Sequence, residues 1–194
     1  MIIGLTGGIG SGKTAALCAL KEDGYYTVSC DDITRELYKK RETLKTLRGE
    51  FPSAIKGKLF LKADKKEIAR IIFSDREKYE FLNDFLTKKT FKTAMQRAYK
   101  AAKTRGAVIV EVPLLFENDL QRYFDKVIVI TRDKDKRIES VKARSALSDK
   151  EIAARIAAQV DYDEIDLSPF TVIKNDGSES DLAAAVVKAV KDLT

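Results

Sequence analysis

The residues best suited to chemistry lie in one stretch, Gly7-Gly8-Ile9-Gly10-Ser11-Gly12-Lys13-Thr14. It fits the pattern G-x-x-x-x-G-K-[ST], in which glycines let consecutive backbone N–H groups turn toward a phosphate. The lysine of such a loop reaches the β- and γ-phosphates, and the following hydroxyl ligates Mg²⁺. A glycine-rich turn followed by a chance Lys-Thr pair is the alternative. Because every fixed position is filled, we predict that the chain binds a nucleoside triphosphate here.

A strand and a helix must hold this loop in place. The apolar run 1–6 contains β-branched residues and predicts a buried strand, while a helix from about Lys13 to Asp23 adds the positive end of its dipole to the phosphate site. Further strands are predicted at 25–29, 107–113, 126–130 and 170–173, and a closing helix at 182–193. The fold class is therefore α/β, a three-layer sandwich with a five-stranded parallel sheet.

Three carboxylates are candidates for function. Asp31 and Asp32 follow the second strand, where they either cap a helix or face the phosphate loop across the carboxyl edge of the sheet. Glu111 lies in an otherwise apolar strand, and a buried carboxylate is costly unless it is paired or near a cation. The chain has no histidine, so a general base must be a carboxylate or, less favourably, a lysine or tyrosine.

Two helical segments interrupt the alternation of strands and helices. Residues 43–105 are mostly charged helix, in which a capping box from Ser74 to Glu77 predicts a long helix starting near Asp75. This insertion is the natural place for a second substrate. Helices at 134–144 and 148–159 carry arginines that are either solvated or part of a lid closing on phosphates, namely Arg137, Arg144 and Arg155.

Composition excludes several classes of protein. The 194 residues carry a net charge of +6, but the lysines are scattered, so we expect no nucleic-acid site. Cys18 and Cys30 have no metal-ligand spacing, and Cys18 is expected in the core. No apolar run has membrane length, which predicts a cytoplasmic protein without a membrane partner. The guanine-reading motif of switch GTPases is also missing.

These motifs, taken in order, resemble the dephospho-CoA kinase family over nearly the full length of the chain. Residues 6–14 are close to that family's loop, and Asp31 with Ile33, Arg35, Glu36 and Leu37 matches its acidic strand end. The other matches are Phe73-Ser74-Asp75, the turn Val112–Glu117, the lid residues Arg144, Leu147, Ser148, Arg155 and Gln159, and Asn175 with Gly177.

The resemblance implies that ATP phosphorylates the ribose 3′-hydroxyl of dephospho-CoA, giving coenzyme A and ADP, with Mg²⁺ as cofactor. It assigns catalysis to Asp31, Lys13 and Arg144, and the metal to Thr14. ATP binding falls to residues 8–14 with Arg144, Asn175 and Gly177, and acceptor binding to Asp31, Arg35, Leu114 and Glu117. We expect a monomer with three parts: a nucleotide-binding core (1–30, 106–131 and 160–194), an acceptor-binding subdomain (31–105) and a lid (132–159).

The chain departs from the family pattern at several positions. Ser29 and Glu111 stand where the family has Asp, Thr87-Lys88 replaces a His-Pro pair, Lys65 replaces an Arg, and Ser140 occupies a position usually held by Arg. Two other functions stay open at this point. One is another P-loop small-molecule kinase acting on a nucleoside or nucleotide, and the other is a non-enzymatic ATP-binding module.

Overall fold

The computed structural model describes residues 1–145 and 148–194, without the side chain of Arg144. Leu147 and the Arg144 side chain, both expected in the lid, therefore lie outside the described residues. The chain divides into two compact units. The first unit comprises Met1–Ser29 and Gln96–Thr194, and the second comprises Cys30–Met95.

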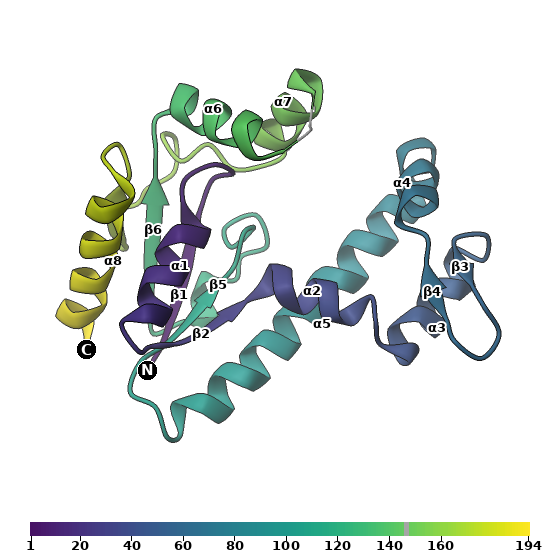
Figure 1. Cartoon of the computed structure of the whole chain (residues 1–194), viewed down its shortest axis with the longest axis horizontal. Helices are drawn as coiled ribbons and strands as arrows, with labels where there is room; N and C mark the ends of the chain where they lie inside the picture. Colours follow the sequence, from purple (N-terminus) through teal and green to yellow (C-terminus); the bar gives the residue numbers. More distant parts are fainter. Residues whose placement is uncertain (146–147) are drawn as a thin grey trace. The chain divides into compact units, whose positions relative to one another are not determined.

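The first unit is built on a five-stranded sheet with the order β2-β5-β1-β6-β7 (Figure 1). All its neighbouring strands pair in parallel. The bounds are Ile2–Gly7 for β1, Tyr26–Ser29 for β2, Val108–Glu111 for β5, Lys126–Thr131 for β6 and Thr171–Lys174 for β7. Every residue of the central strand β1 is buried, as an apolar run in a parallel sheet requires. The predicted α/β sheet is confirmed.

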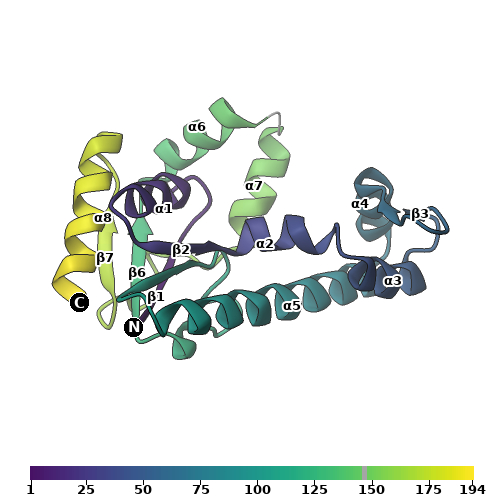
Figure 2. The same ribbon diagram turned by 60° about the horizontal axis from the view of Figure 1, so that its bottom comes forward.

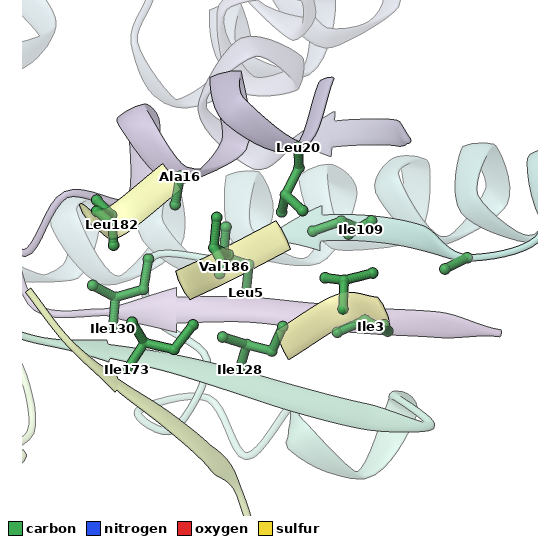
Figure 3. Close-up of a cluster of buried hydrophobic side chains, with 12 residues drawn as sticks. Ile3, Leu5, Ala16, Leu20, Ile109, Ile128, Ile130, Ile173, Leu182 and Val186 are labelled. Atoms are coloured by element: carbon green, nitrogen blue, oxygen red, sulfur yellow. The ribbon is translucent and has the colours of Figure 1, made fainter. Parts of the chain in front are cut away.

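Helices α1 (Lys13–Glu22) and α8 (Glu179–Leu193) pack side by side against the sheet. Figure 3 shows the core between these helices and the sheet, where Leu20 of α1 and Val186 of α8 pack with isoleucines of the strands. The α8 helix begins three residues before the predicted Leu182, because a reciprocal capping box joins Ser178 and Asp181. Cys18 is exposed, contrary to expectation, since α1 buries the face that carries Ala16 and Leu20.

The first unit also contains a 3₁₀ turn and a pair of helices. A 3₁₀ turn, η1 (Gln121–Tyr123), precedes β6, and α6 (Lys134–Arg144) and α7 (Asp149–Ala157) form the predicted helix pair. Ser148 and Glu151 form the predicted capping box of α7. Figure 2 shows this pair beside the loop that joins β1 to α1. In the part of the chain that the structure describes, no helix is both long and apolar enough to cross a membrane.

The second unit is mostly helical, as predicted. It contains α2 (Cys30–Leu37), α3 (Arg41–Glu50), α4 (Lys65–Ser74) and most of α5 (Arg76–Ala102). Helices α3, α4 and α5 contribute to a core that includes Leu47, Phe51 and Leu82. A small antiparallel hairpin of β3 (Ile55–Lys56) and β4 (Lys62–Ala63) was not predicted. Each of its strands has only two residues, too few to show alternation.

The start of α5 differs from the predicted capping box. The Asp75 carboxylate accepts from the Lys78 N–H at 3.0 Å, while the Ser74 hydroxyl donates to carbonyls of α4. Asp75 therefore caps the helix in place of Ser74. One side of α5 is apolar, since Leu82 is buried and the rings of Phe81 and Phe85 stack with their centroids 5.9 Å apart.

Candidate active site

The loop between β1 and α1 has backbone conformations that require glycine. Gly10 has φ +80° and Gly12 has φ +106°. A Cβ on Gly12 would collide with the Asn175 amide nitrogen, and one on Gly10 would collide with the Arg137 carbonyl oxygen. The glycines of the motif therefore serve two purposes, since they allow the turn and leave room for the segments packed against it.

Asn175 supports this loop from the end of β7. Its buried side chain donates to the Ser11 carbonyl oxygen at 2.7 Å, and its backbone N–H donates to Thr131 in the neighbouring strand. The sequence predicted Asn175 as an ATP-binding residue, and the structure shows it in contact with the loop backbone. Gly177 is exposed and lies next to the Asp181 carboxylate of the α8 capping box.

Lys13 and Thr14 open α1, and both are at the surface of the loop. The Lys13 ammonium donates to the carbonyl oxygens of Gly7 at 2.7 Å and Gly8 at 3.0 Å. Thr14 is exposed on the first turn of the helix. A cation and a hydroxyl thus stand at the helix N-terminus, which favours anions through its free N–H groups and its dipole.

Two arginines bring further positive charge to the loop. The Arg137 Nε of α6 donates to the Ile9 carbonyl oxygen at 3.1 Å, and Arg132 Nη1 lies 3.5 Å from the Gly10 carbonyl oxygen. Sequence analysis named Arg137 as a lid arginine but missed Arg132. A usable signal existed, because Arg132 directly follows β6, and ligands of open α/β sheets bind at the carboxyl ends of strands.

A pocket of about 680 Å³ lies within the first unit beside the loop. It is bounded by the loop, the ends of β6 and β7, and the two lid helices, with Gly8, Arg137, Gln159 and Tyr162 among its lining residues. Its lining mixes cationic side chains with the carboxylates of Asp133, Asp161, Asp163 and Asp176. Because the Arg137 guanidinium is bound to the loop, the loop side of the pocket suits an anionic ligand such as a polyphosphate.

Tyr162 is a buried phenol in the wall of this pocket. Its ring packs edge-on against Phe116, with the centroids 6.0 Å apart. The nearby Thr6 hydroxyl is committed to the Val112 carbonyl at 2.8 Å, and the Tyr162 hydroxyl has no hydrogen-bond partner among the described residues. Burial raises the pKa of Tyr162 to about 12. The phenol therefore stays protonated at neutral pH.

Glu111 ends β5 as a buried carboxylate, which the sequence marked as anomalous. The Ser29 hydroxyl donates to Glu111 Oε2 at 2.8 Å, and the two residues are in register on neighbouring strands. This hydrogen bond offsets part of the cost of burying the charge.

The predicted acceptor residues of the turn after β5 make local contacts. Glu117 Oε1 accepts from the Val160 N–H at 3.0 Å, and its buried Oε2 has no partner in the described part of the chain. The Leu114 carbonyl oxygen accepts from the Asn118 side chain at 2.8 Å. Glu117 thus joins this turn to the segment that follows α7.

Asp31 and Asp32 belong to the second unit, at the start of α2, and their surroundings differ. Asp32 pairs with Arg35, three residues along the helix. Asp31 is exposed and makes no hydrogen bond or ion pair with any residue that the structure describes. Both carboxylates are exposed, and only Asp32 has a partner among the described residues.

Comparisons with known proteins agree on one family. A family model described as "CoaE: Dephospho-CoA kinase" matches residues 1–181. A dephospho-CoA kinase from Thermus thermophilus is 32% identical over 195 residues, which cover 100% of this chain and 92% of that protein. A solved structure from Thermus thermophilus has a TM-score of 0.82 at 30% identity, covering 100% of this chain and 98% of the other. A dephospho-CoA kinase from Campylobacter jejuni has a TM-score of 0.74 at 26% identity, covering 99% and 96%.

The loop geometry predicts a specific cost for Gly12→Ala. Gly24 also has a positive φ, of +92°, but nothing lies within 4 Å of the position that a Cβ would take there, so Gly24→Ala measures backbone strain alone, about 1–2 kcal/mol. Gly12→Ala should lose a further ~1–3 kcal/mol, because displacing Asn175 breaks its hydrogen bond to Ser11. Urea unfolding measures both costs, and calorimetry should show weakened ATP binding only for Gly12→Ala. Equal losses in the two variants would contradict this account.

Tyr162 predicts a change of stability in alkaline solution. Its pKa rises from 10.0 in the unfolded chain to about 12 in the folded protein, so the folded state binds more protons in this window. Stability should therefore fall as the pH rises from about 10 to about 12. Tyr162→Phe should remove this part of the fall and cost little at pH 7, because the hydroxyl has no hydrogen bond to lose among the described residues.

The control for this prediction is Tyr99→Phe, which changes an exposed tyrosine. Unfolding free energies from urea titrations between pH 7 and 11 compare the three proteins. If Tyr162→Phe follows the same pH dependence as the wild type, the buried phenol is not the source of the fall.

Proposed function

The chain belongs to the dephospho-CoA kinase family, and we propose that its reaction runs where the phosphate loop meets the carboxyl edge of the sheet. The enzyme is an ATP-dependent phosphotransferase that phosphorylates dephospho-CoA. The ribose 3′-oxygen bonds to the γ-phosphorus while the bond from that phosphorus to the β–γ bridging oxygen breaks, which gives coenzyme A and ADP. The observation that carries this proposal is the loop, with the Lys13 ammonium and the Arg137 guanidinium bound to it.

Charge stabilisation falls to Lys13 and the lid arginines. Phosphoryl transfer depends mainly on positioning and on neutralising charge spread over the phosphoryl oxygens. Lys13 exchanges its loop carbonyl partners for the phosphates, and Arg137 approaches them from α6. Arg144, at the end of the same helix, remains a proposed partner in this role.

Asp31 is proposed to accept the proton of the ribose hydroxyl. The chain has no histidine, Asp32 is held by Arg35, and the exposed Asp31 carboxylate has no competing partner among the described residues. A carboxylate in hydrogen-bond reach of the hydroxyl would orient it in line and take its proton as the new P–O bond forms.

Mg²⁺ is proposed as the cofactor that arrives with ATP. The described residues contain no group of three or more His, Cys, Asp or Glu side chains that could hold a metal, but Mg²⁺ takes most of its ligands from water and substrate phosphates. The exposed Thr14 hydroxyl fits direct ligation, and the Glu111 carboxylate, held by Ser29, fits contact with a metal-bound water. When bound, the ion neutralises charge on the phosphates.

The three-part division expected from the sequence is kept as part of the proposal. Residues 31–105 would bind the pantetheine arm of the acceptor, and Arg35, Leu114 and Glu117 are kept as proposed acceptor-binding residues. Residues 132–159 would act as the lid, and the rest as a monomeric nucleotide-binding core. Support comes from Arg137 and Gln159, which link this lid segment to the phosphate loop.

Acceptor choice tests this function directly. Dephospho-CoA, adenosine, AMP and several other nucleoside monophosphates are offered at equal concentration with ATP, and ADP release is followed. Dephospho-CoA should react faster by orders of magnitude, because binding of its remote arm places the ribose for transfer. A faster reaction with any nucleoside monophosphate would reject the proposed acceptor site while leaving the phosphate loop unaffected.

The pair Asp31 and Asp32 offers a matched test of the base. Asp31→Asn keeps the shape of the side chain and removes its charge, so kcat should fall by about 10²–10⁴ with ATP affinity nearly unchanged. Asp32→Asn should have a small effect, because it removes only an exposed ion pair with Arg35. Steady-state kinetics with dephospho-CoA measure kcat for both variants. A large loss of kcat in Asp32→Asn alone would assign the role of the base to Asp32.

A further inference from the structure

Ile9, in the middle of the phosphate loop, forms hydrogen bonds through both its backbone N–H and its carbonyl oxygen. Its N–H donates to Gln159 Oε1 at 2.6 Å, and its carbonyl oxygen accepts from Arg137 Nε at 3.1 Å. Arg137 lies on α6, and Gln159 lies two residues after the end of α7. One loop residue is therefore held by side chains from both lid helices or their immediate continuation.

The hydrogen bond from Ile9 to Gln159 uses a backbone donor of the loop, and Ile9 is one of the residues that the sequence predicts to bind ATP. In a loop of this type the backbone N–H groups turn inward and bind phosphate oxygens. The amide oxygen of Gln159 is a neutral acceptor, whereas a phosphate oxygen is anionic and forms the stronger, charge-assisted bond with the same donor. The two acceptors cannot occupy the Ile9 N–H with full strength at once.

We propose that Gln159 is a positioning residue that holds the phosphate loop through the Ile9 N–H and yields this donor to a phosphate oxygen when a nucleotide binds. The inference rests on the proposed function, because it takes the loop as the site of the polyphosphate. Gln159 satisfies the N–H of a half-buried residue, and it competes with the nucleotide for that N–H.

The surrounding contacts let the side chain move alone. The next residue, Val160, is tied to Glu117 at 3.0 Å through its backbone N–H, so the chain stays anchored when the Gln159 side chain swings away. The second hydrogen bond of the Gln159 side chain is weak, because Nε2 lies 3.5 Å from the Pro113 carbonyl oxygen. A parallel exchange is proposed above for Lys13, whose ammonium donates to loop carbonyls in this structure.

Two substitutions at Gln159 should change nucleotide affinity in opposite directions. Gln159→Leu keeps most of the volume and removes the competing acceptor, so the dissociation constant for MgADP should fall by about two- to tenfold. Gln159→Glu supplies an anionic acceptor that holds Ile9 more strongly and repels the phosphates, so the constant should rise by at least a similar factor. Isothermal titration calorimetry on the full chain measures both, and inorganic pyrophosphate should show the same opposite shifts.

Ser148→Ala is the matched control for a general loosening of the lid. It removes the capping hydroxyl at the other end of α7 from Gln159, and it should not tighten MgADP. If Gln159 had a purely structural role, binding of MgADP would be weakened in both Gln159→Leu and Ser148→Ala. Weaker or unchanged affinity in Gln159→Leu overturns the inference.

If Gln159→Leu does not fold, Gln159→Glu is the remaining test. Unchanged or tighter binding of MgADP by that variant overturns the inference. Failure of the wild-type chain to bind MgADP would instead reject the proposed nucleotide site and this inference with it. Tight wild-type binding together with the wrong sign in the variants rejects the role of Gln159 only. The two failures are therefore distinguishable.

Discussion

A loop that turns its N–H groups inward must satisfy its carbonyl groups from elsewhere in the protein, and the first unit is arranged around this requirement. The Ser11 carbonyl accepts from Asn175, the Ile9 carbonyl accepts from Arg137, and the carbonyls of Gly7 and Gly8 accept from Lys13. These donors come from the end of β7, from α6 and from α1. Within the loop the Ser11 N–H also donates to the Gly8 carbonyl at 3.1 Å. The loop keeps its shape because separate segments supply the other hydrogen bonds.

The order of the strands makes this arrangement possible. Strand β1 lies between β5 and β6, so the loop that follows it emerges among the carboxyl ends of its neighbours. Glu111 ends β5, Arg132 follows β6, and Asn175 follows β7. A carboxylate, a guanidinium and an amide thus lie at the same edge of the sheet, because each is at the end of a strand or directly after one. Asn175 is also what excludes a side chain at Gly12, whereas the backbone of Arg137 on α6 excludes one at Gly10.

Local features of the sheet and the loop were predictable, whereas contacts between distant segments were not. The apolar runs predicted all five parallel strands, and the glycine pattern predicted the loop, because both signals lie within a few residues. The hairpin β3–β4 is too short to leave a pattern, and Asp75 and Ser74 are equally good capping residues by type. The bond from Gln159 to Ile9 joins residues 150 positions apart, and a neutral amide carries no sequence signal for such a partner.

Ser29 and Glu111 show how a departure from the family pattern can be read through the structure. The two residues are in register on neighbouring strands, so acidic side chains at both positions would place two carboxylates against each other in a buried edge. In this chain the serine hydroxyl donates to Glu111 instead, and one carboxyl group lies there rather than two. The carboxylate on β5 is therefore kept at the edge of the sheet beside the phosphate loop, with a fixed orientation and a neutral neighbour. The exposed carboxylate two residues after Ser29, that of Asp31, pairs with none of the described residues, in keeping with the role toward the acceptor hydroxyl that we propose for it.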